Sequence, residues 1–130
     1  MIKKYFNRFF KFKRLFILLA LMFSLSLSAQ TDQQVYNELK KYNIKHPHIV
    51  LAQAKLETGN YKSKLCRVHG NLFGLNSRKG YRRYNHWTES VKAYKKLIQS
   101  RYKGGDYYAF LTKIRYAKDQ NYIRKLKKIV

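Results

Sequence analysis

Residues 47–59 read PHIVLAQAKLETG, and this stretch organises the predicted fold. Pro47 suits the first turn of a helix, where its missing N–H would have no helical partner in any case. Gly59 suits the position just past a helix, which often takes a left-handed backbone conformation. Because most residues between them are apolar, we predict an apolar helix that starts at Pro47 and ends near Gly59.

Helical spacing recurs on both sides of this stretch. Upstream, Thr31 and Gln34 have the spacing of a capping box, which places a helix start there. Downstream, Gly104 and Gly105 separate two further helices, and Asp119 can cap a last one. Apolar residues at intervals of three and four define the lengths of these helices. They are predicted over residues 32–42, 88–101 and 106–113 and in the segment after Asp119.

The region from Asn71 to Trp87 has a different pattern. Residues 71–75 are mostly apolar, residues 76–80 are polar, and residues 81–87 are rich in aromatic side chains. Two arms around a polar turn predict a β-hairpin. The expected fold class is therefore mainly α (α+β), a helical domain with one small β-hairpin.

The first 29 residues have the pattern of a signal peptide. Six basic residues and no acid lie in residues 1–14, an uncharged run of 13 residues covers 15–27, and small residues follow at Ser28 and Ala29. The run is short for a membrane-spanning helix, which needs roughly 20 residues. We expect this leader to be removed after Ala29, or after Ser28, and residues 30–130 to form one exported domain. An uncleaved membrane anchor is the alternative.

The expected mature domain is strongly basic. Its 23 lysines and arginines and six acids give a net charge of +17, which favours an anionic partner or surface. Nucleic acid, anionic lipid and acidic cell-wall polymer all satisfy the charge, but export argues against nucleic acid. Cys66 is the only cysteine, so an internal disulfide is excluded. Its apolar neighbours favour a buried, inert thiol.

Glu57 is the strongest candidate for a catalytic group among the six carboxylates. It lies at the end of the apolar helix, with Val50, Gln53 and Ala54 on the same face. Burial and the negative end of the helix dipole should both raise its pKa. A carboxylic acid that stays protonated near neutral pH can protonate a leaving oxygen. The alternative is an ion pair of Glu57 with a nearby base, for which the candidates are Lys55, Lys62 and Arg67.

The other titratable residues indicate no second site by their spacing. Four carboxylates fall near predicted helix starts, and Glu38 lies on the polar side of the first helix. The histidines lack the spacing of a zinc site, so no metal or other cofactor is expected. Tyrosines are abundant, and their rings suit both stacking on sugar faces and ordinary core packing. The helix-start carboxylates are Asp32, Glu89, Asp106 and Asp119, and the histidines are His46, His48, His69 and His86.

Several blocks of this sequence resemble the glucosaminidase family (glycoside hydrolase family 73). They occur in the order and spacing of the family and extend over nearly all of residues 46–130. Together they are specific, whereas the first block alone would be only suggestive. The blocks are LAQAKLETG at 51–59, SKL at 63–65, NLFGL at 71–75, YNHWTESVKAY at 84–94 and YAKDQNY at 116–122.

This resemblance implies a lysozyme-like fold with a groove, and hydrolysis of the β-1,4 bond from N-acetylglucosamine to N-acetylmuramic acid in peptidoglycan. Glu57 matches the family's catalytic glutamate, and Tyr116 matches a tyrosine of its active site. Asn71 and Phe73 match a motif that helps shape the groove. Core packing is the alternative for Phe73 and Tyr122. We expect Glu57 and Tyr116 to be catalytic, and the candidate substrate-binding residues are Gln53, Asn71, Phe73, Tyr84 and Tyr122.

One departure from the family pattern concerns a second acid. Some members carry it on a longer hairpin, but residues 71–87 contain no Asp or Glu. The N-acetyl group of the substrate could then act as the nucleophile, which leaves Glu57 as the only essential carboxylate. Tyr116 could orient that group or steady the developing positive charge.

The expected function is that of a monomeric peptidoglycan hydrolase, an endo-β-N-acetylglucosaminidase. We expect it in the periplasm or outside the cell, associated with the wall, without nucleic acid and without stable membrane insertion after processing. Two alternatives remain open. A lytic transglycosylase also needs a single glutamate in such a groove, and a non-catalytic wall-binding module would keep the fold.

Overall fold

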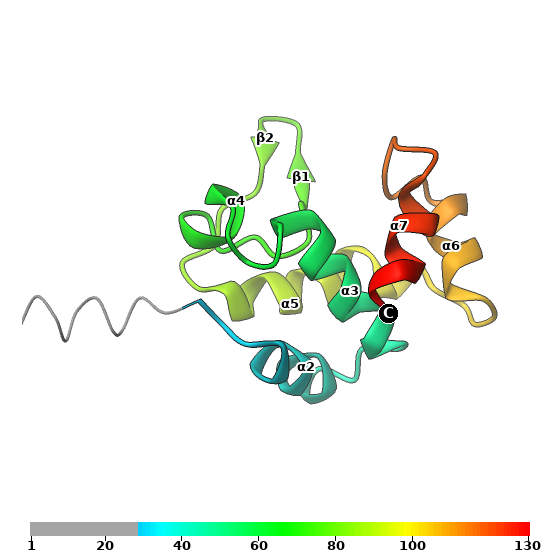
Figure 1. Cartoon of the computed structure of the whole chain (residues 1–130), viewed down its shortest axis with the longest axis horizontal. Helices are drawn as coiled ribbons and strands as arrows, with labels where there is room; N and C mark the ends of the chain where they lie inside the picture. Colours follow the sequence, from blue (N-terminus) through cyan, green and yellow to red (C-terminus); the bar gives the residue numbers. More distant parts are fainter. Residues whose placement is uncertain (1–28) are drawn as a thin grey trace, which may run out of the picture.

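A computed structural model describes residues 29–130 of the protein, and the expected signal peptide lies almost entirely outside these residues. Within them the chain forms six α-helices, one 3-10 helix and one two-stranded antiparallel sheet (Figure 1). This confirms the predicted fold class. None of the helices in the described part is long and apolar enough to cross a membrane. The helices are α2 (Asp32–Lys41), α3 (Pro47–Thr58), α4 (Lys64–Arg67), α5 (Trp87–Leu97), η1 (Gln99–Arg101), α6 (Tyr107–Lys113) and α7 (Tyr122–Ile129).

Helix α3 lies at the centre of the domain and is the apolar helix predicted from Pro47 to near Gly59. It runs between α2 on one side and α7 on the other and packs against both (Figure 1). Pro47 is its first residue, and Gly59 caps it in the left-handed conformation with φ 55°. Val50 and Ala54 are completely buried. Burial of a side chain the size of Val50 stabilises the fold by roughly 1.5–3 kcal/mol.

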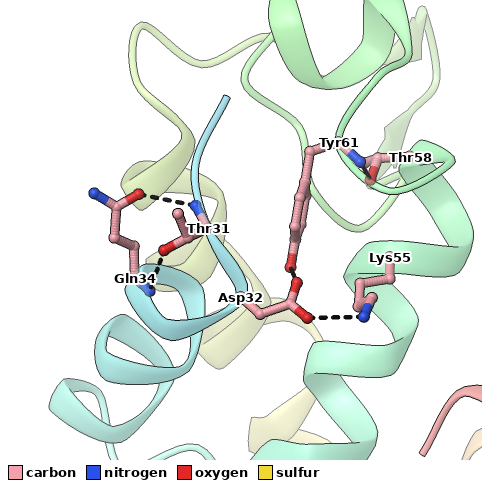
Figure 2. Close-up of polar contacts among 6 residues, drawn as sticks. All are labelled: Thr31, Asp32, Gln34, Lys55, Thr58 and Tyr61. Carbon is pink, nitrogen blue, oxygen red and sulfur yellow. Dashed lines mark hydrogen bonds and ion pairs between the residues drawn. The ribbon is translucent and has the colours of Figure 1, made fainter. Parts of the chain in front are cut away.

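The contact between α2 and α3 is polar at its exposed edge. Figure 2 shows the predicted capping box at the start of α2, in which the side chains of Thr31 and Gln34 each bind the other residue's backbone N–H. In the next residue, Asp32, one carboxylate oxygen pairs with Lys55 of α3 at 2.8 Å. The other accepts a hydrogen bond from the Tyr61 hydroxyl at 2.9 Å. Asp32 therefore ties α2 to α3 as well as starting its own helix.

The predicted hairpin exists, but its strands are not where the sequence pattern placed them. Strands β1 (Asn76–Ser77) and β2 (Gly80–Tyr81) lie inside and at the edge of the predicted turn. Residues 71–75, expected as the first arm, form a loop instead. The Leu75 carbonyl still accepts from the backbone N–H of Arg82 at 2.8 Å, but the loop is also held by the side chain of Asn71. Its amide group binds the backbone of Leu75 and Arg82.

The helices after the hairpin follow the prediction in type and deviate at their ends. The segment predicted as one helix over 88–101 is divided into α5 and η1, and α5 starts one residue earlier with His86 as its cap. Asp106 caps α6 as predicted. Asp119 lies before α7 and accepts from the N–H of Asn121, which is the residue at the cap position.

Helix α4 was not predicted. It has four residues, which is too short for a periodic apolar pattern, and Ser63 caps it by accepting from the N–H of Cys66. Cys66 is buried as expected, and burial raises the pKa of its thiol. Gln30 lies against its sulfur at 2.8 Å.

Candidate active site

Glu57 is the penultimate residue of α3 and is half-buried. Burial raises the pKa of its carboxyl group, while a hydrogen bond from the Tyr122 hydroxyl acts in the opposite direction. Within residues 29–130, no lysine, arginine or histidine lies within ion-pair distance of Glu57. Lys55, one of the three bases considered as its partner, pairs with Asp32 instead. In the described structure, Glu57 is therefore a partly desolvated acid rather than a member of an ion pair.

The loop before the hairpin comes close to Glu57 at Gly74. A Cβ atom at this position would lie 3.0 Å from Oε2 of Glu57 and 3.8 Å from Cε1 of Tyr81. Gly74 also has a φ of 63°, a region that L side chains rarely adopt. The absence of a side chain at Gly74 thus allows the carboxylate of Glu57 and the ring of Tyr81 to lie against the same piece of backbone.

Two other candidate residues, Tyr122 and Gln53, are hydrogen-bonded to one another beside Glu57. Nε2 of Gln53 donates to the Tyr122 hydroxyl at 3.2 Å. Gln53 is fully buried, four residues before Glu57 on α3, and Tyr122 starts α7 and is 7% exposed. Burial, followed by the nearby Glu57 carboxylate, raises the pKa of Tyr122 far above its ordinary value. Tyr122 is therefore an un-ionised phenol that binds Glu57.

Tyr116, the second candidate catalytic residue, lies in the segment between α6 and α7. Its ring centroid is 5.7 Å from that of Tyr122. Burial, then the proximity of Tyr122 and Glu57, raises its pKa well above the ordinary value. Its hydroxyl donates to the backbone carbonyl of Phe73 at 2.5 Å. Because a phenol has one proton, Tyr116 presents oxygen lone pairs, rather than a donor, to any further partner.

Asn71 and Phe73 are both buried and hold the loop that carries Gly74. The amide of Asn71 is occupied by backbone groups of Leu75 and Arg82, at 2.9–3.0 Å. The ring of Phe73 packs against Tyr94, with centroids 4.5 Å apart. In this conformation both residues shape the site from behind, and neither offers a free polar group to a ligand.

Tyr84 is placed apart from this group. It is half-buried in a surface depression whose walls also include Cys66, His86 and Trp87, and Glu57 is not part of that depression. Its hydroxyl is buried without a hydrogen-bond partner among the described residues. The structure therefore brings Gln53, Tyr116 and Tyr122 together with Glu57, with Asn71 and Phe73 behind them, and leaves Tyr84 elsewhere.

The remaining carboxylates have structural partners that account for them. Asp32 pairs with Lys55, and Glu38 lies 3.8 Å from Lys41. Glu89 accepts from the backbone N–H of Asn85 at 3.1 Å. Asp106 caps α6, and Asp119 pairs with Lys125 at 2.6 Å. In residues 29–130 there is no group of three or more His, Cys, Asp or Glu side chains that could hold a metal ion.

Comparison with known protein families shows the family to which the chain belongs. The sequence model of the family Glucosaminidase, described as mannosyl-glycoprotein endo-beta-N-acetylglucosaminidase, matches residues 32–130. The chain belongs to the glucosaminidase family. Membership of this family implies hydrolysis of a glycan, and the match includes every residue of the site around Glu57. No curated protein and no solved structure gave a match to the chain.

Two residues at the site of this glucosaminidase domain were not among the candidates from the sequence. Gly74 is part of the NLFGL block, but its role at the site depends on its contact with Glu57. This contact joins residues that are distant in the sequence. Tyr81 is 59% exposed at the end of β2, next to Gly74. An aromatic residue in the hairpin was the available signal for Tyr81, but several neighbours share it.

Proposed function

We propose that this protein is a peptidoglycan hydrolase that cleaves the β-1,4 bond between N-acetylglucosamine and N-acetylmuramic acid, with Glu57 as the general acid. The observation that carries the proposal is the state of Glu57. It is partly buried, has no basic partner in the described structure, and has a raised pKa. A raised pKa favours the protonated form, which is the form that can transfer a proton to a glycosidic oxygen.

The absence of a free second carboxylate from the described residues favours a mechanism with one acid. The other five carboxylates are occupied by bases, caps or backbone N–H groups. Glu57 would protonate the leaving oxygen while the carbonyl oxygen of the substrate's own N-acetyl group forms a bond to the anomeric carbon. Water would then open this cyclic intermediate, and Glu57 would take a proton from that water.

Tyr116 and Tyr81 both lie near Glu57 and are suited to binding the sugar. The lone pairs of the Tyr116 hydroxyl could accept the N–H of the N-acetyl group and hold its carbonyl oxygen toward the anomeric carbon. The exposed ring of Tyr81 offers an apolar face for a sugar ring. Tyr122 would act on the acid itself, since its hydroxyl lies beside Glu57.

Peptidoglycan as the substrate is supported by charge and by the leader. The domain after the leader carries a net charge of +17, and peptidoglycan has carboxylates on its lactyl and peptide groups. Long-range attraction would help to bring the two together. The leader pattern in residues 1–29 favours export to the periplasm or beyond, and N-terminal sequencing of the protein recovered from the wall fraction tests this.

The decisive experiment is digestion of purified sacculi, with mass spectrometry of the new chain ends. We expect reducing N-acetylglucosamine ends from the wild-type protein and almost none from Glu57→Gln. A 1,6-anhydro-muramic end would instead identify a lytic transglycosylase. Binding to sacculi without any new ends would identify a non-catalytic wall-binding module, and either result would overturn the proposal.

A further inference from the structure

A buried hydrogen-bond network runs from Tyr122, beside Glu57, into the core of the domain. It connects α3, α5, η1, α6 and α7, and each of its five side chains is at most 7% exposed. Of these five side chains, the proposed reaction uses only the tyrosine next to Glu57, so the other four need a separate explanation. The buried network consists of Tyr122, Gln53, Tyr94, Tyr107 and Gln99.

The far end of the buried network is held by backbone. The N–H of Lys45 donates to Oε1 of Gln99 at 2.8 Å, and the carbonyl of Lys45 accepts from Nε2 of Gln99 at 3.0 Å. A backbone N–H can only donate and a carbonyl can only accept, so the side-chain amide of Gln99 has one orientation. Its Nε2 also donates to the Tyr107 hydroxyl at 2.7 Å.

The fixed orientation of the Gln99 amide determines the direction in which each following hydroxyl donates its proton. Nε2 of Gln99 cannot accept, so the single proton of Tyr107 is left for its other partner, the Tyr94 hydroxyl at 2.6 Å. Tyr94 in turn donates its proton to Oε1 of Gln53 at 2.6 Å. The amide of Gln53 is thereby oriented with its Nε2 toward Tyr122.

The last step reaches the acid. Nε2 of Gln53 donates to the Tyr122 hydroxyl and cannot accept from it, so the proton of Tyr122 is left free for another acceptor. Glu57 is the carboxylate that lies close to this hydroxyl. We propose that the backbone clamp on Gln99 sets the direction of the whole buried network and keeps Tyr122 a hydrogen-bond donor to Glu57. Gln53, Tyr94, Tyr107 and Gln99 are then positioning residues. The inference rests on the proposed role of Glu57 as the acid.

A fixed donor opposes the effect of burial on Glu57. A hydrogen bond to the ionised carboxylate favours that form and lowers the pKa, whereas burial raises it. The other titratable groups that face Glu57 in the described structure are tyrosines as well, Tyr116 from the segment before α7 and Tyr81 from β2. With no charged side chain against the acid in this part of the chain, the direction of the buried network becomes a main control on its protonation.

The test is a pH titration of the glutamate carboxyl groups by ¹³C NMR in the folded protein. The chain has three glutamates, so each signal can be assigned with Glu38→Gln, Glu57→Gln and Glu89→Gln. Tyr122→Phe removes the donor itself and should raise the pKa of Glu57. Tyr94→Phe keeps the ring that packs against Phe73 and removes only the hydroxyl that orients Gln53. It should produce about half of the rise seen in Tyr122→Phe, or more, and no further rise in the Tyr122→Phe background.

Tyr61→Phe is the matched control. It also removes the hydroxyl of a buried tyrosine, but that hydroxyl binds Asp32 and lies outside the buried network. The pKa of Glu57 should be unchanged in this variant. If Tyr94→Phe does not fold, the pKa of Glu57 is measured in Gln99→Met instead, because this variant removes the backbone clamp at the far end.

The inference is overturned if the variant that folds leaves the pKa of Glu57 at the wild-type value, or if Tyr61→Phe raises it equally. These readings need no enzymatic activity. They are therefore independent of whether Glu57→Gln abolishes cleavage, which tests the proposed function.

Discussion

Two carboxylates at helix α3 have similar neighbouring groups, but their pKa values are shifted in opposite directions. Asp32 reaches α3 from the neighbouring helix, and Glu57 lies on α3 itself. Each is hydrogen-bonded by the hydroxyl of a buried tyrosine, Tyr61 in the first case and Tyr122 in the second. Yet the pKa of Asp32 is lowered, chiefly by its hydrogen bond with Lys55, and the pKa of Glu57 is raised by burial.

The difference comes from the burial of Glu57 and from the place of a single lysine on the helix. Lys55 and Glu57 are two residues apart on α3, and residues at this spacing point to different sides of a helix. Lys55 therefore pairs with Asp32 at the α2 edge (Figure 2), and within residues 29–130 Glu57 has no cation at ion-pair distance. A carboxylate with a lysine partner holds helices together, whereas one that is desolvated and faces only phenols is suited to acid catalysis.

The largest expected effect is on catalysis. Glu57→Gln removes the acid and keeps the shape, so cleavage of sacculi should fall by roughly 10²–10⁴, the usual contribution of general acid catalysis. Asp32→Asn should keep its rate, because Asp32 binds α3 away from the site. Release of muropeptides under equal enzyme concentrations measures both. More than about a tenth of the wild-type activity in folded Glu57→Gln would remove Glu57 from the role of acid.

The next effect concerns the backbone beside Glu57. Gly74→Ala places a Cβ atom 3.0 Å from Oε2 of the carboxylate, in a conformation with φ 63°. We expect a rate loss of roughly tenfold or more, since small displacements of a catalytic group are costly. Gly59→Ala is the control, because it has a similar φ of 55° and nothing within 4 Å of the added atom.

Both glycine variants should lose about 1 kcal/mol of unfolding free energy from backbone strain. Chemical denaturation measures this loss, and initial rates on sacculi measure the activity. Equal rates in the two variants would show that contact between Gly74 and Glu57 is unimportant for catalysis.

Stability as a function of pH should separate the two carboxylates by sign. The pKa of Glu57 is raised in the folded state, so the fold binds its proton more tightly and loses stability as pH rises above the unfolded value near 4.5. Glu57→Gln should then be more stable than the wild type at pH 7, with the gain disappearing in acid. The pKa of Asp32 is lowered, so its contribution is present above 3.8 and is lost as pH falls through the folded value.

Asp32→Asn should accordingly be less stable at pH 7, by less than about 1 kcal/mol because the pair is exposed. The two differences from wild type, measured by urea denaturation between pH 3 and pH 7, are expected to have opposite signs. The same sign at pH 7 would contradict the comparison.

The smallest effect is expected at Glu89, which belongs with Asp32 as a structural carboxylate. It is exposed in the first turn of α5, where it accepts from the N–H of Asn85. Glu89→Gln should cost about 0.3–1 kcal/mol of stability, the usual value for an acid at a helix start. Its rate on sacculi should equal that of the wild type. A loss of rate comparable to Glu57→Gln would reveal Glu89 as a second catalytic carboxylate.

Elements whose signals are local could be predicted from the amino-acid sequence. The capping box of Thr31 and Gln34, the position of Pro47 and the left-handed cap at Gly59 are interactions within one or two turns of helix, and all were predicted. Glu57 could be singled out because the other acids lie near helix starts or on a polar face. The fold class followed from the same periodic patterns.

Contacts between residues far apart in the sequence depend on how the helices pack. Lys55, Lys62 and Arg67 were equally available to Glu57 in sequence, and packing of α2 against α3 assigned Lys55 to Asp32. The hairpin strands are shorter and closer to the turn than predicted, and the amide of Asn71 binds the loop before them.

The same holds for the surroundings of the acid. Tyr122 and Tyr116 reach Glu57 from about sixty residues away along the chain, and Tyr84 does not reach it. A hydrogen bond between residues so far apart depends on the packing of whole helices, which leaves no periodic trace in the sequence near either partner.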